Sequence, residues 1–181
     1  MKPRGPLMIE HRLIEKMIEL LKAEIPIIKA EQKVEPFFID TVVDFIRIYA
    51  DRTHHGKEED ILFKALESKN ISEPDQKNMN ELIEEHKYGR KLVAELVQAK
   101  EEYLAGDPEA LATILEKFAA LVEFYPEHIK KEDLVFFPDT EKYFTKEELD
   151  AMLEAFWEFD RNMIHEKYKN VVEQTRQKLG L

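Results

Sequence analysis

Apolar side chains recur at alternating spacings of three and four residues through four long segments, and this periodicity constrains the fold more than any other feature of the sequence. In the first segment the repeating positions are Leu7, His11, Ile14, Ile18, Leu21, Ile25 and Ile28. Such spacing places side chains on one face of an α-helix. We therefore predict helices over residues 7–30, 36–67, 74–105 and 108–136, and the capping pair described next adds a fifth helix over residues 146–178.

Several helix boundaries are marked by residues with known end preferences. Residues 106–108 read Gly-Asp-Pro, which supplies a glycine after one helix, then a capping aspartate and a first-turn proline for the next. Thr145 and Glu148 form a capping-box pair at the start of the fifth helix. Because proline lacks a backbone N–H, we expect Pro26 to kink or shorten the first helix and Pro138 to end the fourth.

The short connections between these segments favour antiparallel neighbours. The predicted fold class is all-α, an up-down-up-down four-helix bundle with an additional C-terminal helix. We expect residues 1–144 to form the bundle and residues 145–181 to form the helix packed on it, within a single domain overall. A chain of 181 residues is long enough to bury such a core.

Composition excludes several classes of function. The formal net charge is -11, and nucleic-acid phosphates require a basic face, so we expect no nucleic-acid partner. The chain has no cysteine, which excludes disulfides, iron–sulfur clusters and thiolate zinc sites. No apolar run approaches the ~18 residues of a membrane span, and the N-terminus lacks an apolar signal-peptide region. The sequence predicts a cytoplasmic protein with no membrane partner, as a monomer or homodimer.

Polar residues interrupt the apolar stripes at one height of the predicted bundle. The residues concerned are His11, His54, Glu58, His86, His128 and Glu132. Their histidines lie at nearly equal distances along the helices from the connecting loops, which places them level with one another. An unpaired imidazole or carboxylate in a core is strongly unfavourable, so we infer that bound cations compensate for all six.

A local repeat supports a site for two ions. Residues 54–63 align without gaps on residues 128–137, and both begin with His-x-x-x-Glu. Spacing of four places the His and Glu on one helix face. The two helices run parallel in the predicted topology, so the pairs face each other and each carboxylate can bridge two metals. The same alignment selects His54 as a ligand and directs His55 away from the stripe.

Donor chemistry narrows the metal. Mixed imidazole and carboxylate donors suit iron, manganese or zinc. Ferritin-like di-iron sites use Glu-x-x-His on two helices, and no glutamate lies three residues before any stripe histidine here. A histidine-rich, carboxylate-poor pair of ions is better suited to reversible binding of a small molecule than to ferritin-type iron oxidation.

These motifs resemble the hemerythrin-like, or HHE cation-binding, family. The similarity covers about residues 7–138 and rests on His11, the two His-x-x-x-Glu pairs, Glu85-His86 and the segment Phe136-Phe137-Pro138. It implies a left-twisted four-helix bundle holding two iron ions joined by an oxo or hydroxo bridge. It also implies binding of dioxygen or nitric oxide, for storage, sensing or stress response.

Two positions depart from the oxygen-carrying hemerythrins. Those proteins have a second histidine one turn after the third-helix histidine, where this chain has Arg90. Their last carboxylate is an aspartate five residues after its histidine, whereas Glu132 follows His128 by four. The first departure leaves one iron short of a ligand. His165 on the fifth helix is a candidate metal ligand for that gap, with a surface or structural histidine as the alternative.

Other residues near the stripes have two interpretations each. Glu59 and Asp133 either orient the ligands or face solvent, and Tyr125 is either a core aromatic or a metal contact. Gly89, three residues after His86, either leaves space for a diatomic ligand or permits close helix packing.

Three classes of function are consistent with these features. The first is a di-iron protein that binds dioxygen or nitric oxide. The second is a di-iron oxidase or peroxidase, which would also need a proton donor and a path for reductant, and the sequence shows neither clearly. The third is a metal-sensing interaction module. Catalytic turnover therefore stays open at this point.

Overall fold

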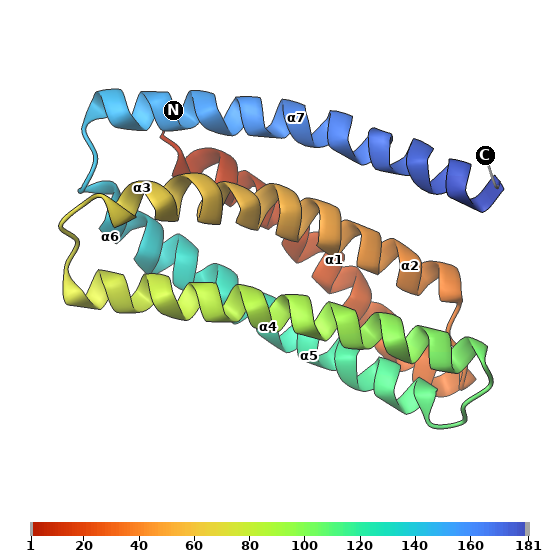
Figure 1. Cartoon of the computed structure of the whole chain (residues 1–181). Helices are drawn as coiled ribbons and strands as arrows, with labels where there is room; N and C mark the ends of the chain where they lie inside the picture. The colour runs from red at the N-terminus through yellow and green to blue at the C-terminus, as the bar shows by residue number, and fades with distance from the viewer. Residues whose placement is uncertain (1, 180–181) are drawn as a thin grey trace.

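The computed structural model describes residues 2–179, and in that part of the chain every regular element is a helix. Five helical rods are present, which confirms the predicted all-α class (Figure 1). Their segments are α1 (Arg4–Glu31); α2 (Pro36–Asp44), η1 (Phe45–His55), η2 (Glu58–Phe63) and α3 (Lys64–Glu67); α4 (Glu73–Leu104); α5 (Ala110–Lys131), η3 (Glu132–Phe136) and α6 (Phe137–Glu141); and α7 (Lys146–Leu179).

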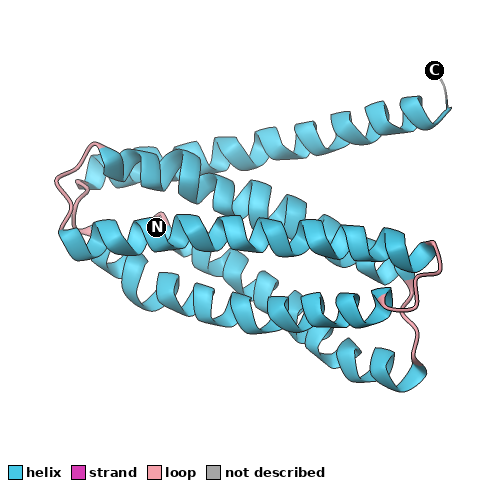
Figure 2. Cartoon of the chain, turned by 60° about the horizontal axis from the view of Figure 1, so that its bottom comes forward, coloured by secondary structure: helices cyan, strands magenta, loops and turns pink. Residues whose placement is uncertain are grey.

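The first four rods form a bundle in which each rod contacts two neighbours. α1 packs on α5 and on η1, while α4 packs on α5 and on the rod that contains α2 and η1. The fifth rod, α7, lies outside and contacts η1 and η2. Figure 2 shows that α7 diverges from the bundle towards its C-terminal end. The sequence prediction of a bundle with an added helix is confirmed.

A buried polar layer divides the core of the bundle into two apolar clusters. Along α1, Leu7 belongs to one cluster and Ile14 to the other, with His11 between them. Along the fourth rod, Tyr125 and Phe136 lie on the two sides in the same way. The predicted height of the polar residues is therefore confirmed, because the layer crosses the different rods at one level.

Helix ends agree with the capping analysis at two places. Gly106 has a φ of 88°, the left-handed conformation that glycine adopts without strain. At the start of α7, the backbone N–H of Thr145 donates to Glu148 Oε2 at 2.9 Å, and the Glu148 N–H donates to Thr145 Oγ1 at 3.2 Å. This reciprocal pair is the predicted capping box.

Two expectations about where proline ends a helix are corrected. Pro26 does not shorten α1, which continues past it to Glu31. Pro138 does not end the fourth rod, because it occupies the first turn of α6, where a proline is tolerated, and helix continues to Glu141.

Three stretches, η1, η2 and η3, are π-helices, which the α-helical periodicity did not predict. A π-helix bonds residue i to residue i+5 and is found mostly as short segments at functional sites. The Thr53 hydroxyl bonds the carbonyl of Ile48, five residues earlier, in keeping with this wider turn. All three segments border the polar layer.

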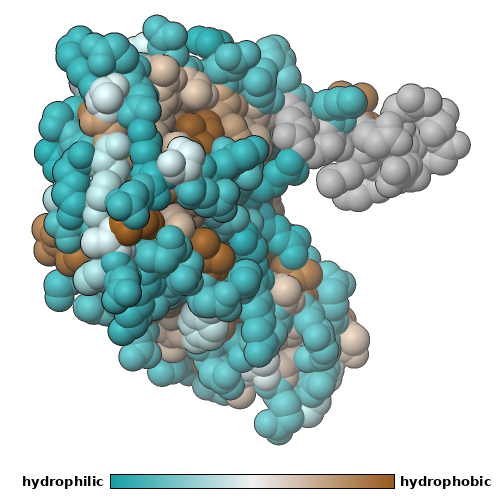
Figure 3. Space-filling view, turned by 60° about the vertical axis from the view of Figure 1, so that its left-hand side comes forward, coloured by the Kyte–Doolittle hydropathy of each residue, from teal (hydrophilic) through white to brown (hydrophobic). Residues whose placement is uncertain are grey.

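Hydrophilic residues dominate the face shown in Figure 3, and hydrophobic residues appear there as smaller patches. Within the described residues, none of the helices combines the length and apolar character that crossing a bilayer would require.

Candidate metal centre

Seven buried side chains from all four rods meet in the polar layer. Possible ligand atoms lie within 4.8 Å of one another in two groups. One group is His11, His54, Glu58 and Glu132, and the other is His55, His86 and His128. The first six predicted metal residues are therefore brought together, and His55 joins them.

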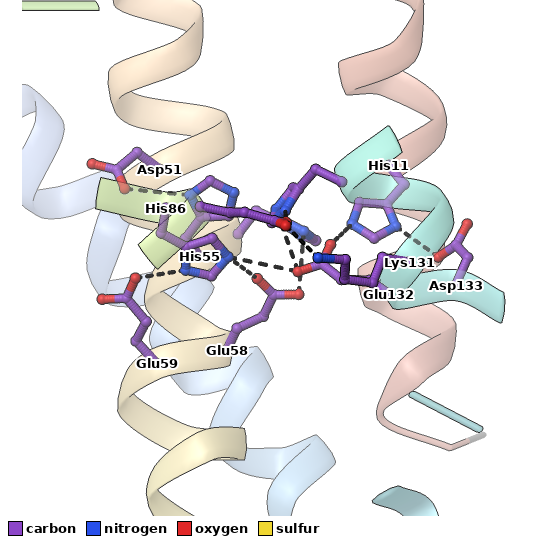
Figure 4. A network of polar contacts seen from close by, with 12 residues as sticks. His11, Asp51, His55, Glu58, Glu59, His86, Lys131, Glu132 and Asp133 are labelled. Atoms are coloured by element: carbon purple, nitrogen blue, oxygen red, sulfur yellow. Dashed lines mark hydrogen bonds and ion pairs between the residues drawn. The ribbon is translucent and has the colours of Figure 1, made fainter. Parts of the chain in front are cut away.

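Glu58 and Glu132 each reach both groups. Glu132 Oε2 lies 3.1 Å from the Nε2 of His11, and its Oε1 lies 3.3 Å from the Nε2 of His128. Glu58 Oε1 lies 3.5 Å from the Nε2 of His54, and its Oε2 lies 3.4 Å from the Nε2 of His86. Figure 4 shows both carboxylates between the ring of His11 on one side and those of His55 and His86 on the other. This is an arrangement in which a carboxylate can bridge two ions.

The inward-facing atoms are buried and lack hydrogen-bond partners. They are the Nε2 atoms of His11, His54, His86 and His128 and all four carboxylate oxygens of Glu58 and Glu132. A buried polar atom without a partner destabilises a fold by about 1–3 kcal/mol. Eight such atoms in one layer require a shared partner, and imidazole nitrogens with carboxylate oxygens are donors that suit iron, manganese or zinc. The residues present therefore fit a metal pair.

Each of the five histidines directs its other ring nitrogen, Nδ1, to a carboxylate. The bonds are His11 to Asp133 (2.7 Å), His54 to Glu10 (2.9 Å), His55 to Asp51 (3.4 Å), His86 to Glu59 (2.6 Å) and His128 to Glu85 (2.8 Å). Metal-bound histidines almost always donate this N–H to such a partner, which fixes the tautomer and aims Nε2 at the metal. Glu59 and Asp133 thus orient two histidines of the layer, which agrees with the first of the two roles considered for them.

Four of these bonds link neighbouring rods into a closed ring, which we call the carboxylate belt. The links run from His11 on α1 to Asp133 on η3, from His128 on α5 to Glu85 on α4, from His86 on α4 to Glu59 on η2, and from His54 on η1 to Glu10 on α1. Each rod gives one histidine to the rod on one side and one carboxylate to the rod on the other.

Cationic side chains hold the orienting carboxylates in turn. Arg12 bonds Asp133, Lys57 bonds Glu10, and Lys131 bonds Glu85. Arg90 donates to Asp51 and to Glu59, each at 2.8 Å. Every histidine of the centre therefore has a carboxylate behind it and a cation behind that carboxylate.

Without a metal, the surroundings of the layer disfavour the simultaneous ionisation of Glu58 and Glu132. Burial, together with the negative charge of Glu132, raises the pKa of Glu58 well above its ordinary value. Burial also acts to raise the pKa of Glu132, but His128 and His11 outweigh it and hold that pKa well below its usual range. Burial lowers the pKa of His54, which keeps its ring neutral and able to bind a cation. Metal binding would replace the protons that the layer carries.

Comparison with known proteins gives one family. The model of the hemerythrin HHE cation-binding domain matches residues 6–140, well over half of the chain and the whole of the polar layer. The chain belongs to the hemerythrin family. No curated protein and no solved structure matched it. Its buried His and Glu groups therefore lie in a cation-binding domain and could hold metal.

In this hemerythrin-family chain the expected place of His55 is corrected. Its side chain is 2% exposed, and its ring stacks on that of His86 with centroids 3.8 Å apart. The π-helical turn of η1 brings two consecutive residues to the inner face, whereas an α-helical register admits one. A signal was present in the sequence: the carboxylate of Asp51, one turn before His55, accepts from its ring.

The expected place of His165 is corrected as well. It lies on α7 with an exposed side chain and belongs to neither group of possible ligands. His55, in contrast, brings an additional imidazole into the polar layer. Arg90, at the position of the missing family histidine, holds the carboxylates that orient His55 and His86.

The two remaining stripe residues are core residues in this structure. Tyr125 is 1% exposed and packs in an apolar cluster. At Gly89 an added Cβ would lie 3.2 Å from Phe124 Cε1, which favours the close-packing interpretation.

Proposed function

We propose that this chain holds two iron ions bridged by Glu58 and Glu132. In this assignment His11 and His54 bind one ion, and His55, His86 and His128 bind the other. The observation that supports it is the set of buried, unpartnered Nε2 and carboxylate oxygen atoms, in which each of the two glutamates faces histidines of both groups. An oxo or hydroxo bridge is part of the same proposal.

We further propose that the iron pair binds a diatomic ligand, dioxygen or nitric oxide, for storage, sensing or stress response. The asymmetry of the donors supports this, because the His11–His54 side offers one imidazole fewer than the other side. A position is thereby left for a small molecule on that side. A ferrous pair would supply the electrons that bound dioxygen accepts.

Aromatic rings around the histidines would keep bulk water from the centre. Phe137 stacks on His11 with centroids 5.8 Å apart, Phe63 on His86 at 5.9 Å, and Phe124 on His128 at 5.1 Å. An apolar lining that excludes water favours reversible binding of a neutral diatomic molecule. Water and protons would otherwise promote the release of dioxygen as a reduced species.

The test is to purify the protein, measure iron per chain, and record near-ultraviolet and visible spectra of the reduced protein before and after adding dioxygen or nitric oxide. We expect two irons per chain and a spectral change with at least one of the two gases. Two irons without any change would retain the metal assignment and overturn ligand binding. Hydrogen peroxide turnover in a parallel assay would favour the oxidase or peroxidase alternative.

A further inference from the structure

Part of the chain beyond the family match reaches the metal centre. The match ends at residue 140, and α7 begins at Lys146. α7 packs on η1 and η2, the segments that carry His54 and Glu58. The contact is tight: Phe156 is fully buried, and a Cβ added at Gly56 would lie 2.8 Å from Phe159 Cζ.

Lys57 connects α7 with the centre. Its side chain is 0% exposed, and its ammonium donates to Asp160 Oδ1 on α7 at 2.6 Å and to Glu10 on α1. The same nitrogen lies 5.9 Å from the ring centroid of Phe156. Since lysine is almost never fully buried unless it is paired, both carboxylates are needed to hold it there.

Glu10 also contacts His54, a proposed metal ligand. Its other oxygen, Oε2, accepts from the Nδ1 of His54 at 2.9 Å. A continuous series of polar contacts therefore runs from Asp160 through Lys57 and Glu10 to His54.

The other histidines are held differently. The cations behind their carboxylates are Arg12, Arg90 and Lys131, which are 53%, 40% and 30% exposed at the side chain. When such an exposed cation moves away, water can take its place beside the carboxylate. Lys57 has no such freedom, because Asp160 and Phe156 cover it from the α7 side.

We propose that Asp160 is a positioning residue of the metal centre, and that the docking of α7 and metal binding on the His11–His54 side are coupled. The inference rests on the proposed metal site. Coupling between two equilibria is reciprocal, so the factor by which docked α7 raises metal affinity equals the factor by which metal favours docking.

The first test compares three single variants by anaerobic titration with ferrous iron. Glu10→Gln, which removes the carboxylate behind His54, should weaken one of the two sites by roughly 10–100-fold. Asp160→Asn should weaken the same site by a smaller factor, roughly 3–10-fold. Glu158→Gln removes an equal charge from an exposed residue of α7 and should bind iron as the parent does.

The second test follows α7 itself by hydrogen exchange in metal-free and iron-loaded protein. Amides of residues 150–163 should gain protection on loading in the parent and in Glu158→Gln, and the gain should be lost in Asp160→Asn. This readout does not depend on activity and also detects a variant that has lost its fold.

The two proposals fail in different ways. If the parent binds two irons, but Asp160→Asn matches Glu158→Gln in affinity and α7 protection is unaffected by iron, the role of Asp160 is refuted and the metal site stands. If the parent binds no metal, the proposed function and this inference are both refuted.

Discussion

The polar layer differs from a set of ordinary core histidines in what its ring nitrogens contact. Nδ1 meets a carboxylate in all five residues, while the Nε2 atoms of His11, His54, His86 and His128 are buried without a hydrogen-bond partner. A histidine that serves only packing needs neither a carboxylate at Nδ1 nor a cation that holds this carboxylate. The identity of the ligands can therefore be tested one residue at a time.

Replacing His55 with alanine should lower bound iron from two ions towards one per chain, because the three-histidine side loses a donor. His54→Ala and His128→Ala should also lower the iron content. His165→Ala should keep the full content, since that side chain is exposed on α7. The measurement is iron per chain after loading and desalting. Full iron in His55→Ala would show that His55 is not a ligand, as the sequence pattern predicted.

Iron affinity should rise with pH. The carboxylates of Asp133 and Glu132 outweigh burial and raise the pKa of His11 to about 9 in the metal-free protein. At pH 7 this ring carries a proton that must leave before Nε2 can bind a cation, so uptake should release protons and strengthen up to about pH 9. Titration calorimetry in two buffers of different ionisation enthalpy would measure the release. A pH-independent affinity would contradict the assigned protonation of His11.

At the scale of the helices, the type of helical hydrogen bonding, α or π, matters as much as the amphipathic pattern. Helix positions, the capping box and the layer containing six of the seven buried His and Glu residues followed from periodicity and spacing. His55 did not, because the extrapolated α-helical register does not include the π-turns of η1 and η2. The contact of Asp160 with Lys57 joins residues 103 positions apart, and no local pattern specifies such a pair.

Substituting Gly56 with alanine should loosen α7. Alanine improves helix propensity by about 1 kcal/mol. The added Cβ would overlap the ring of Phe159, however, and overpacking destabilises by roughly 1–3 kcal/mol. We expect a net loss of stability in urea denaturation and faster proteolysis within α7. An increase in stability would show that Phe159 moves aside without penalty.

At the scale of the whole molecule, the proposed metal pair would lie between the two apolar clusters, where the structure has unpaired polar groups. Burial of uncompensated charge opposes folding, and bound ions would remove that opposition. Binding and global stability are linked, because a ligand of the native state stabilises it by mass action.

Removing iron with a chelator should therefore lower the unfolding midpoint of the entire bundle. At a free metal concentration 1,000 times the dissociation constant, the expected loss is about 4 kcal/mol. Thermal unfolding with and without chelator measures it, with His54→Ala as a control that should respond less. Equal midpoints in both conditions would mean that the layer is stable without its ions.

The carboxylate belt also bears on the handedness of the bundle. Apolar stripes on four helices can pack equally well with the helices arranged clockwise or anticlockwise, since hydrophobic contact has no direction. In the mirror arrangement Glu10 and Asp133 would turn towards the opposite neighbours and could not reach His54 and His11. The polar layer thus excludes a competing topology that the hydrophobic pattern alone would permit.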